Sequence, residues 1–231
     1  MSRTPPIVGL EKATFRYGGF VALDQATVEV GSGDFVGVRG GNGSGKTTLL
    51  RALAGTIPPR SGRRVGRPRC AYVPAALEPP PLTVAQWIQG LRHHARDPLQ
   101  ALQHLAFRGE LNRPCHALSF GNLRKVLLAE ALSADVDLVV IDEARVGLDD
   151  AGNNALDMLV RDARSRGTAV VIAEQDSHPI GATTQLWRLT AGQVHHTEEE
   201  SDRIVSATFH GPSSLIGKLA SAARRLGLEQ T

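Results

Sequence analysis

A glycine-rich loop that ends in a lysine and a threonine is the stretch of this sequence best suited to chemistry. Residues 40–47 fit the pattern G-x-x-x-x-G-K-[ST]. Glycines let such a loop curl until successive backbone N–H groups face a phosphate, and the helix that follows adds the positive end of its dipole. The sequence therefore predicts a nucleoside triphosphate site, and a flexible glycine-rich hairpin is the less favoured alternative. The predicted binding residues are Gly40, Gly41, Asn42, Gly43, Ser44, Gly45, Lys46, Thr47 and Thr48.

Within this loop, Lys46 and Thr47 have separate predicted roles. The Lys46 ammonium can reach the β- and γ-phosphates, and the Thr47 hydroxyl can bind Mg²⁺. Lysine is rare in this chain, which has only Lys12, Lys46, Lys125 and Lys218 beside many arginines. A lysine retained at the end of the loop is therefore well explained by phosphate binding.

Two adjacent carboxylates complete the set of residues that could act on a nucleotide. The apolar run 138–141 reads as a buried strand and ends in Asp142 and Glu143. Asp142 is placed to hold Mg²⁺ together with Thr47, and Glu143 to orient or deprotonate an attacking water. A purely structural role for this acidic strand end is the alternative, but the phosphate loop earlier in the chain favours the functional interpretation.

The elements that must position these residues alternate between strands and helices. Strands are predicted at 7–15, 26–30, 34–38, 71–73, 137–142 and 168–173, with an edge hairpin formed by 186–189 and Val194. Helices are predicted at 46–54, 83–94, 98–107, 121–133 and 151–165. Residues 58–69, with five arginines, read as an exposed turn-rich connection. This order predicts an α/β fold with a mostly parallel sheet covered by helices.

Composition is that of an ordinary globular protein. Of the 231 residues, 42% are hydrophobic and 21% charged, and the net charge of +3 gives little reason to expect nucleic acid as a partner. The two cysteines, Cys70 and Cys115, suit a reducing cytosol. The start of the chain lacks the apolar core of a signal peptide, and its apolar runs are too short to span a bilayer. We expect a cytoplasmic protein, held at a membrane only by a partner.

Five motifs in a characteristic order resemble the ABC ATPase family over about residues 7–194. Besides the loop and the acidic strand end, the segment around Tyr17 resembles the family's opening, where an aromatic residue stacks on adenine. Residues 118–122, Leu-Ser-Phe-Gly-Asn, resemble the LSGGQ signature, and 147–149, Gly-Leu-Asp, resemble the D-loop. GTPases with a phosphate loop would need an Asn-Lys-x-Asp base reader, which this sequence lacks.

The resemblance implies a fold, a set of cofactors and two partners. The fold would be that of a P-loop NTPase with a mostly parallel sheet, an antiparallel β-subdomain and a small helical subdomain at about 76–118. The ATP-binding domain would span 1–200. From the residues themselves, the acidic run 197–202 marks a boundary, and 203–231 read as a short C-terminal extension with a strand at 204–209 and a helix at 213–226. ATP and Mg²⁺ would lie between two head-to-tail subunits, so that Ser119 and Gly121 contact the nucleotide of a second ABC ATPase subunit. A transmembrane permease would dock on 76–107 at the inner face of the cell membrane.

Several positions depart from the family pattern. Ala75 stands where a glutamine normally senses the γ-phosphate, and Gln175 stands where a switch histidine is expected. The signature has Phe120 for a glycine and Asn122 for a glutamine. Alanine can neither bind Mg²⁺ nor orient water, and glutamine lacks the positive charge available to histidine. We therefore expect secure ATP binding, with Glu143 and Gln175 as the catalytic pair and slow or partner-dependent hydrolysis.

Two functions from different classes follow from this mixture. The first is an ATPase subunit that couples MgATP binding and hydrolysis to conformational change in a transmembrane partner. The second is a degenerate ATP-binding subunit that regulates or braces a complex while another subunit hydrolyses. The intact Lys46, Asp142 and Glu143 favour the first, and Ala75 and Gln175 favour the second. The histidine pairs at 93–94 and 195–196 lack carboxylates or cysteines at ligand spacing and are read as solvated.

Overall fold

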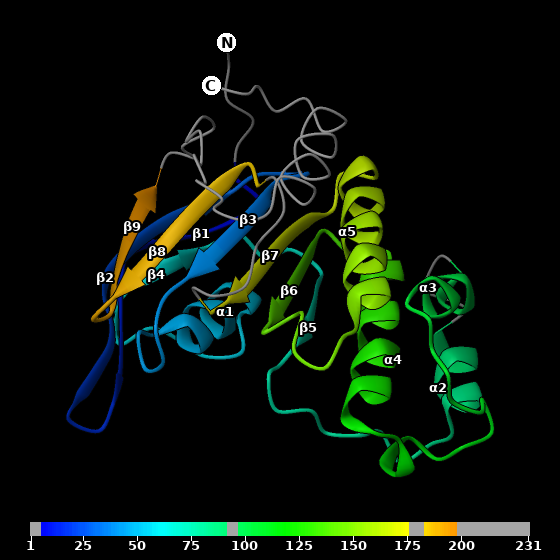
Figure 1. Cartoon of the computed structure of the whole chain (residues 1–231). Coiled ribbons are helices and arrows are strands. Elements are labelled where there is room, and N and C mark those ends of the chain that lie inside the picture. Colours follow the sequence, from blue (N-terminus) through cyan, green and yellow to red (C-terminus); the bar gives the residue numbers. More distant parts are fainter. Residues whose placement is uncertain (1–5, 92–96, 176–182, 198–231) are drawn as a thin grey trace, which may run out of the picture. The chain divides into compact units, whose positions relative to one another are not determined.

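The computed structural model describes residues 6–91, 97–175 and 183–197, all of which belong to one compact unit, Met1–Glu199 (Figure 1). The strand and helix predicted after residue 203, and His93 and His94, lie outside the described residues. Among the helices that the structure does describe, none is long and apolar enough to cross a membrane.

The centre of the fold is a six-stranded sheet in the order β5-β6-β7-β3-β8-β9. Its strands are β3 (Phe35–Arg39), β5 (Cys70–Val73), β6 (Leu138–Asp142), β7 (Ala169–Glu174), β8 (Gln185–Thr190) and β9 (Gln193–Thr197). Neighbouring strands from β5 to β8 run parallel, and β9 pairs antiparallel with β8 as the predicted edge hairpin. The expected mostly parallel α/β sheet is confirmed. Because parallel strands end at the same edge, the loops after β3, β5, β6 and β7 meet there.

A second, antiparallel sheet has the order β2-β1-β4 and comprises β1 (Val8–Tyr17), β2 (Phe20–Val30) and β4 (Ser61–Val65). This sheet is the expected antiparallel subdomain. The interpretation of 58–69 as a turn-rich connection is wrong in its central part, because β4 pairs with β1 there. β4 is an exposed edge strand, so it lacks the apolar alternation by which strands are recognised. Its Gly62 lets β1 approach closely, since a Cβ atom there would lie 2.1 Å from the Lys12 carbonyl oxygen.

The helices lie close to their predicted positions. They are α1 (Lys46–Ala54), α2 (Val84–Leu91), α3 (Pro98–His104), α4 (Phe120–Ser133) and α5 (Asp150–Ser165), with a short 3-10 helix at Cys115–Ala117. Side-chain caps begin three of them: Asp97, Ser119 and Asp149 each accept a hydrogen bond from a first-turn backbone N–H of α3, α4 and α5. α2 and α3, with the 3-10 helix, fall in the range expected for the helical subdomain.

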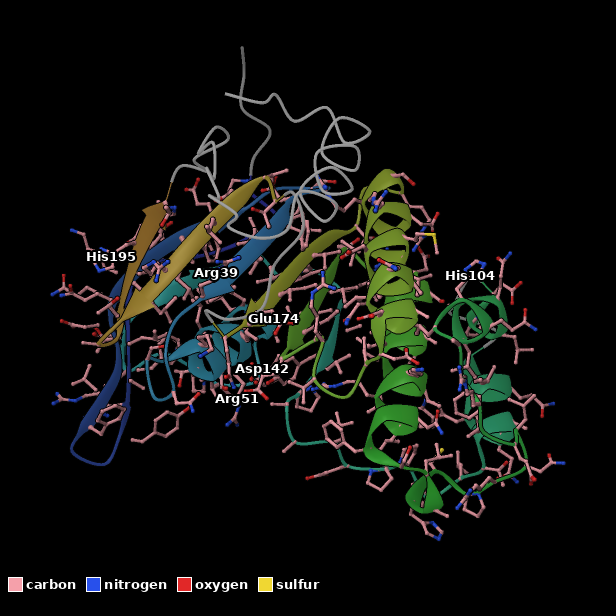
Figure 2. All side chains as sticks on the ribbon, viewed as in Figure 1. Arg39, Arg51, His104, Asp142, Glu174 and His195 are labelled. Carbon is pink, nitrogen blue, oxygen red and sulfur yellow. The ribbon has the colours of Figure 1, made fainter. Side chains whose placement is uncertain are left out.

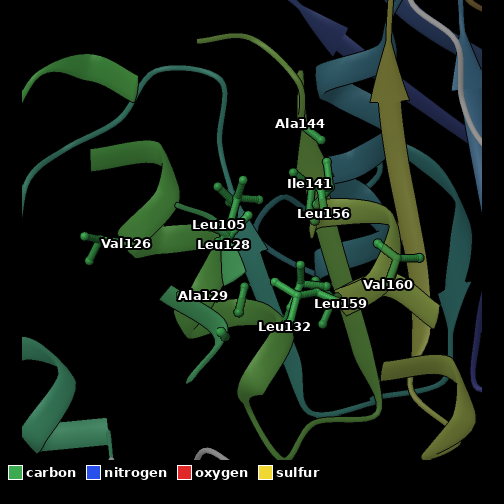
Figure 3. Close-up of a cluster of buried hydrophobic side chains, with 14 of the residues drawn as sticks. Leu105, Val126, Leu128, Ala129, Leu132, Ile141, Ala144, Leu156, Leu159 and Val160 are labelled. Carbon is green, nitrogen blue, oxygen red and sulfur yellow. The ribbon is translucent and has the colours of Figure 1, made fainter. Parts of the chain in front are cut away.

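Two hydrophobic clusters fill the two faces of the large sheet. Alternation along β6 divides its side chains: Val139 and Ile141 face the cluster with α4 and α5, whereas Leu138 and Val140 face the cluster with α1 and the antiparallel sheet. Figure 3 shows the first cluster, in which Leu132 and Leu156 gather beside β6. Helices thus cover both faces of the sheet, and the edge where its parallel strands end remains available for a site.

Candidate functional site

The phosphate loop lies between the end of β3 and the start of α1, as predicted. Gly45 precedes the helix with φ of +108°, a conformation that L side chains rarely adopt, and a Cβ atom there would lie 2.4 Å from the Ala22 carbonyl oxygen. At the other end of the loop, a Cβ atom on Gly40 would lie 2.6 Å from the Leu189 carbonyl oxygen. Both glycines are therefore required by close approach of neighbouring backbone, and the loop is held between β2 and β8.

The Lys46 side chain folds back over its own loop. Its Nζ donates to the Gly40 carbonyl oxygen at 2.6 Å and to the Gly41 carbonyl oxygen at 3.0 Å. The side chain is almost fully buried. An ammonium held by the loop in this way lies where phosphates bound to the loop's N–H groups would meet it.

Thr47 and Asp142, which are far apart in the sequence, meet at the start of α1. The Thr47 hydroxyl donates to Asp142 Oδ2 at 2.6 Å, because α1 crosses the end of β6. Figure 2 shows Asp142 at this end of β6, beside α1. Burial raises the pKa of the Asp142 carboxyl, and the hydrogen bond from Thr47 opposes that shift. A hydroxyl and a buried carboxylate side by side fit the oxygen donors that Mg²⁺ prefers, and a cation there would offset the cost of burying the charge.

Glu143 follows directly and has an unusual backbone conformation. Its φ is +54°, in the left-handed region, and its N–H donates to the Ala173 carbonyl oxygen at 2.9 Å. The Gln175 amide Nε2 donates to Glu143 Oε1 at 3.4 Å. The two residues predicted as the catalytic pair are thus neighbours, and Gln175 contacts the carboxylate itself.

A pocket of about 230 Å³ joins Lys46, Thr47 and the two carboxylates, and Gln175 is not part of its lining. It is lined by the phosphate loop from Asn42 to Thr48, by Asp142 and Glu143, and by Tyr17 and Phe20. A larger hollow of about 360 Å³ borders the other side of the loop, but its lining includes neither Lys46 nor Asp142, so the smaller pocket is the candidate site. Tyr17 and Phe20 flank the Gly18-Gly19 turn and are both exposed, with 49% and 59% of their surface accessible. They suit the stacking of a purine ring.

Ser119 and Gly121 lie apart from this pocket, whose lining does not include them. Ser119 caps α4 by accepting from the Asn122 N–H at 3.3 Å, and a Cβ atom on Gly121 would lie 2.5 Å from the Gly147 carbonyl oxygen. The signature-like segment therefore packs against the D-loop-like segment of the same chain.

Two residues at the site were missed from the sequence. Phe20 is not among the predicted binding residues, although an aromatic pair around a Gly-Gly turn is a readable signal. Arg124 is not among the predicted site residues either, although it is fully buried and donates to the carbonyl oxygens of Pro74 and Glu143. An arginine amid the apolar positions of α4 was the available signal.

Among the residues that the structure describes, the remaining candidates contribute no further site. Within the described ranges, no three His, Cys, Asp or Glu side chains gather in an arrangement that could hold a metal ion. His195 and His196 lie on β9, where His196 contacts the Trp187 ring edge. Of the arginines in 58–69, Arg63 pairs with Glu11 and Arg69 with Asp137. Trp87 packs against the core, and its indole N–H donates to Glu130 at 3.0 Å.

Comparison with known protein families gives one match that spans more than half of the chain. A family model described as "ABC transporter" matches residues 23–146. The chain is 34% identical over 189 residues to zinc import ATP-binding protein ZnuC 1 of Hahella chejuensis, a match that covers 78% of this chain and 72% of that protein. It is 33% identical over 207 residues to zinc import ATP-binding protein ZnuC of Cereibacter sphaeroides, covering 87% and 84%.

Solved structures with the same fold are more distant in sequence. A dimeric ATP-binding cassette with bound ADP and phosphate, in a post-hydrolysis state, superposes with a TM-score of 0.69 at 20% identity, covering 83% of this chain and 98% of that one. An inward-facing ABC transporter of the metal-chelate type superposes with a TM-score of 0.68 at 24% identity, covering 84% and 83%.

Proposed function

This chain belongs to the family of ABC transporter ATP-binding proteins, and we propose that it powers zinc import through a transmembrane permease by binding and hydrolysing MgATP. It is the ATP-binding subunit of an ABC transporter. The observation that carries the mechanism is the 2.6 Å contact between Thr47 and Asp142, which joins the phosphate loop to the acidic end of β6. Lys46 and Glu143 line the same pocket.

Each part of the pocket has a role in this proposal. The N–H groups of the loop and the Lys46 ammonium bind the phosphates, and Tyr17 and Phe20 flank the adenine. Thr47 and Asp142 would hold Mg²⁺, which would supply positive charge opposite the phosphates when bound. The Glu143 carboxylate orients the attacking water and accepts its proton. Glu143 acts from a backbone position fixed by its N–H bond to Ala173.

A second ATP-binding subunit, identical or different, completes the site. Ser119 and Gly121 lie at the start of α4, outside their own pocket, where a head-to-tail partner would bring its nucleotide. The fold shared with a dimeric cassette supports this arrangement. The permease holds the pair at the inner face of the cell membrane, on its cytoplasmic side.

Zinc is proposed as the cargo from the relatives. The two relatives described above are both zinc import ATP-binding proteins, and the similarity extends over more than three quarters of this chain. The cation would cross the permease. This subunit would supply the energy without contacting the cation.

The proposal is tested with the complex. The chain is tagged, purified from its own cells with its membrane partner and placed in lipid vesicles that contain MgATP. Zinc uptake should rise with ATP turnover, and Lys46→Ala in the tagged chain should abolish both. Turnover without zinc uptake would reject zinc as the cargo, and a complex that lacks any membrane protein would reject the transport role.

The contact between Gln175 and Glu143 favours a second candidate function. The amide donates to the carboxylate that should direct water, and Ala75 lacks a side chain that could sense the γ-phosphate. Under this candidate the chain binds ATP, hydrolyses it slowly or not at all, and braces a complex in which another subunit does the chemistry. Full turnover by a complex whose only ATP-binding subunit is this chain would exclude it.

A further inference from the structure

A buried arginine on α4 joins the ends of two neighbouring strands. The Arg124 side chain has no accessible surface. Its Nη1 donates to the Pro74 carbonyl oxygen at 3.0 Å, and its Nη2 donates to the Glu143 carbonyl oxygen at 2.9 Å. Pro74 follows β5 and Glu143 follows β6, which pairs with β5 in parallel. One rigid guanidinium thus sets the spacing between the two segments.

Burying this charge is costly, so its retention calls for an explanation. Burial lowers the pKa of Arg124, although the carboxylates of Glu143, Glu174 and Asp142 oppose that shift. The guanidinium carbon also lies 5.5 Å from the centroid of the Phe120 ring. Replacing buried ionic groups together with their partners by apolar side chains of similar volume is often neutral for stability. A purely stabilising role is therefore a weak reason for an arginine here, and its geometry is the stronger one.

The backbone that Arg124 holds is strained. Glu143 has φ of +54°, and non-glycine residues persist in that region only where their surroundings enforce it. The Glu143 carbonyl oxygen accepts from Arg124 and, at 3.2 Å, from the Val146 N–H. Removing the guanidinium leaves one of these two bonds. The direction of the Glu143 side chain depends on this backbone conformation.

α4 also holds the far end of the loop that Glu143 begins. The next residue, Lys125, donates to the Ala106 carbonyl oxygen at 3.1 Å and lies 3.5 Å from Asp149 Oδ1. Consecutive side chains of one helix therefore contact both ends of the segment 143–149. The segment is held in place from α4, the helix that starts at the signature-like residues.

We propose that Arg124 is a positioning residue for ATP hydrolysis. Its guanidinium holds the Glu143 backbone in its working conformation and links that backbone to residues 74–76. This inference rests on the proposed role of Glu143. Because Ala75 has no side chain that could report on the γ-phosphate, movement of that segment reaches Glu143 through the Pro74 carbonyl and the guanidinium. Docking of the permease beside this segment would then alter the position of the water-directing carboxylate.

Two variants and one matched control separate positioning from stability. Arg124→Met keeps the volume and removes both hydrogen bonds, whereas Arg124→Lys keeps the charge but loses the planar fork. The control is Arg64→Gln, because Arg64 also bridges two segments, donating to the carbonyl oxygens of Leu53 and Gly66. Those contacts lie at the end of α1 far from the phosphate loop.

The variants are compared in the full-length chain purified with its membrane partner. Turnover at saturating ATP should fall about a hundredfold for Arg124→Met and about tenfold for Arg124→Lys, because small misplacements of a catalytic group have effects of this size. The Kd for MgATP should stay within about threefold of the parent, since a contact used only in the reaction leaves ground-state binding intact. Arg64→Gln should lower the thermal midpoint and leave turnover unchanged.

Hydrogen exchange gives a readout that requires no turnover. The Val146 amide should exchange faster in both Arg124 variants and at the parental rate in Arg64→Gln. Parental turnover in Arg124→Met, or parental exchange at Val146, would overturn the inference. A Glu143→Gln complex is measured in parallel: if its turnover survives, the proposed function fails. If Glu143→Gln abolishes turnover while both Arg124 variants retain it, only the role of Arg124 fails.

Discussion

Replacement of Lys46 by alanine tests the phosphate site at a cation that lines its pocket. The Lys46 ammonium donates to the carbonyl oxygens of Gly40 and Gly41 at 2.6 Å and 3.0 Å. The ammonium has three N–H donors, so one is left for a phosphate oxygen, and any further bond to a phosphate replaces one of these two bonds. Lys46→Ala loses every bond between the ammonium and the phosphates. Where such a bond would have replaced a bond to a loop carbonyl, the variant loses less binding free energy than the number of phosphate bonds suggests.

The size of the loss follows from the bonds involved. A hydrogen bond to a charged group contributes about 1.5–3 kcal/mol, and one or two such bonds are lost net. A loss of about 3 kcal/mol weakens the affinity for MgATP by roughly a hundredfold. Arg161→Ala is the matched control, because it removes a positive charge from an exposed position on α5.

The assay is calorimetric titration of MgATP into the full chain at fixed salt. We expect the Kd of Lys46→Ala to rise by this factor and that of Arg161→Ala to stay at the parental value. Circular dichroism of both variants checks that the fold is retained. An unchanged Kd for Lys46→Ala would refute the assignment of the phosphate loop, and an equal loss in both variants would indicate an unspecific charge effect.

Three further outcomes are expected. Burial raises the pKa of the Asp142 carboxyl above its value in the unfolded chain. The nucleotide-free fold therefore loses stability as pH rises from the unfolded pKa through the higher folded pKa, because the carboxyl must ionise while buried. Asp142→Asn should therefore raise the thermal midpoint at neutral pH while removing the effect of Mg²⁺ on ATP affinity, and a lower midpoint with the Mg²⁺ effect intact would contradict this. Gln175→His should raise turnover of the complex by about ten- to a hundredfold, since it replaces the amide on Glu143 by an imidazole, and no gain would show that the departure is compensated elsewhere. Gln89→Trp, on the exposed face of α2, should reduce copurification with the membrane partner and leave ATP affinity unchanged; undisturbed copurification would argue against docking on this helix.

The phosphate loop and the acidic strand end could be predicted because their signals are local. A glycine pattern before a helix and an apolar run before two carboxylates are each readable within ten residues. The contact between Thr47 and Asp142 could be expected from their shared role as Mg²⁺ ligands, but its distance depends on how α1 crosses the sheet. Nothing in a local pattern sets that crossing.

The misses have a common physical cause. β4 was overlooked because an exposed edge strand needs no apolar alternation, and its pairing with β1 joins distant parts of the chain. The role of Arg124 could not be predicted because its partners are backbone carbonyl oxygens, which every residue has. The residue types of Pro74 and Glu143 therefore give no sign of the contact. Contacts between side chains and distant backbone are decided by tertiary structure alone.

The most direct test of the account compares Glu143→Gln with the parent chain in the complex with its membrane partner. Turnover is measured at saturating MgATP, and the Kd for MgATP is measured on the same preparations. We predict that Glu143→Gln retains the parental Kd and loses turnover, because the carboxylate acts on the water and makes no essential contact with the nucleotide. Parental turnover in Glu143→Gln would contradict the central claim that this chain hydrolyses ATP at Glu143.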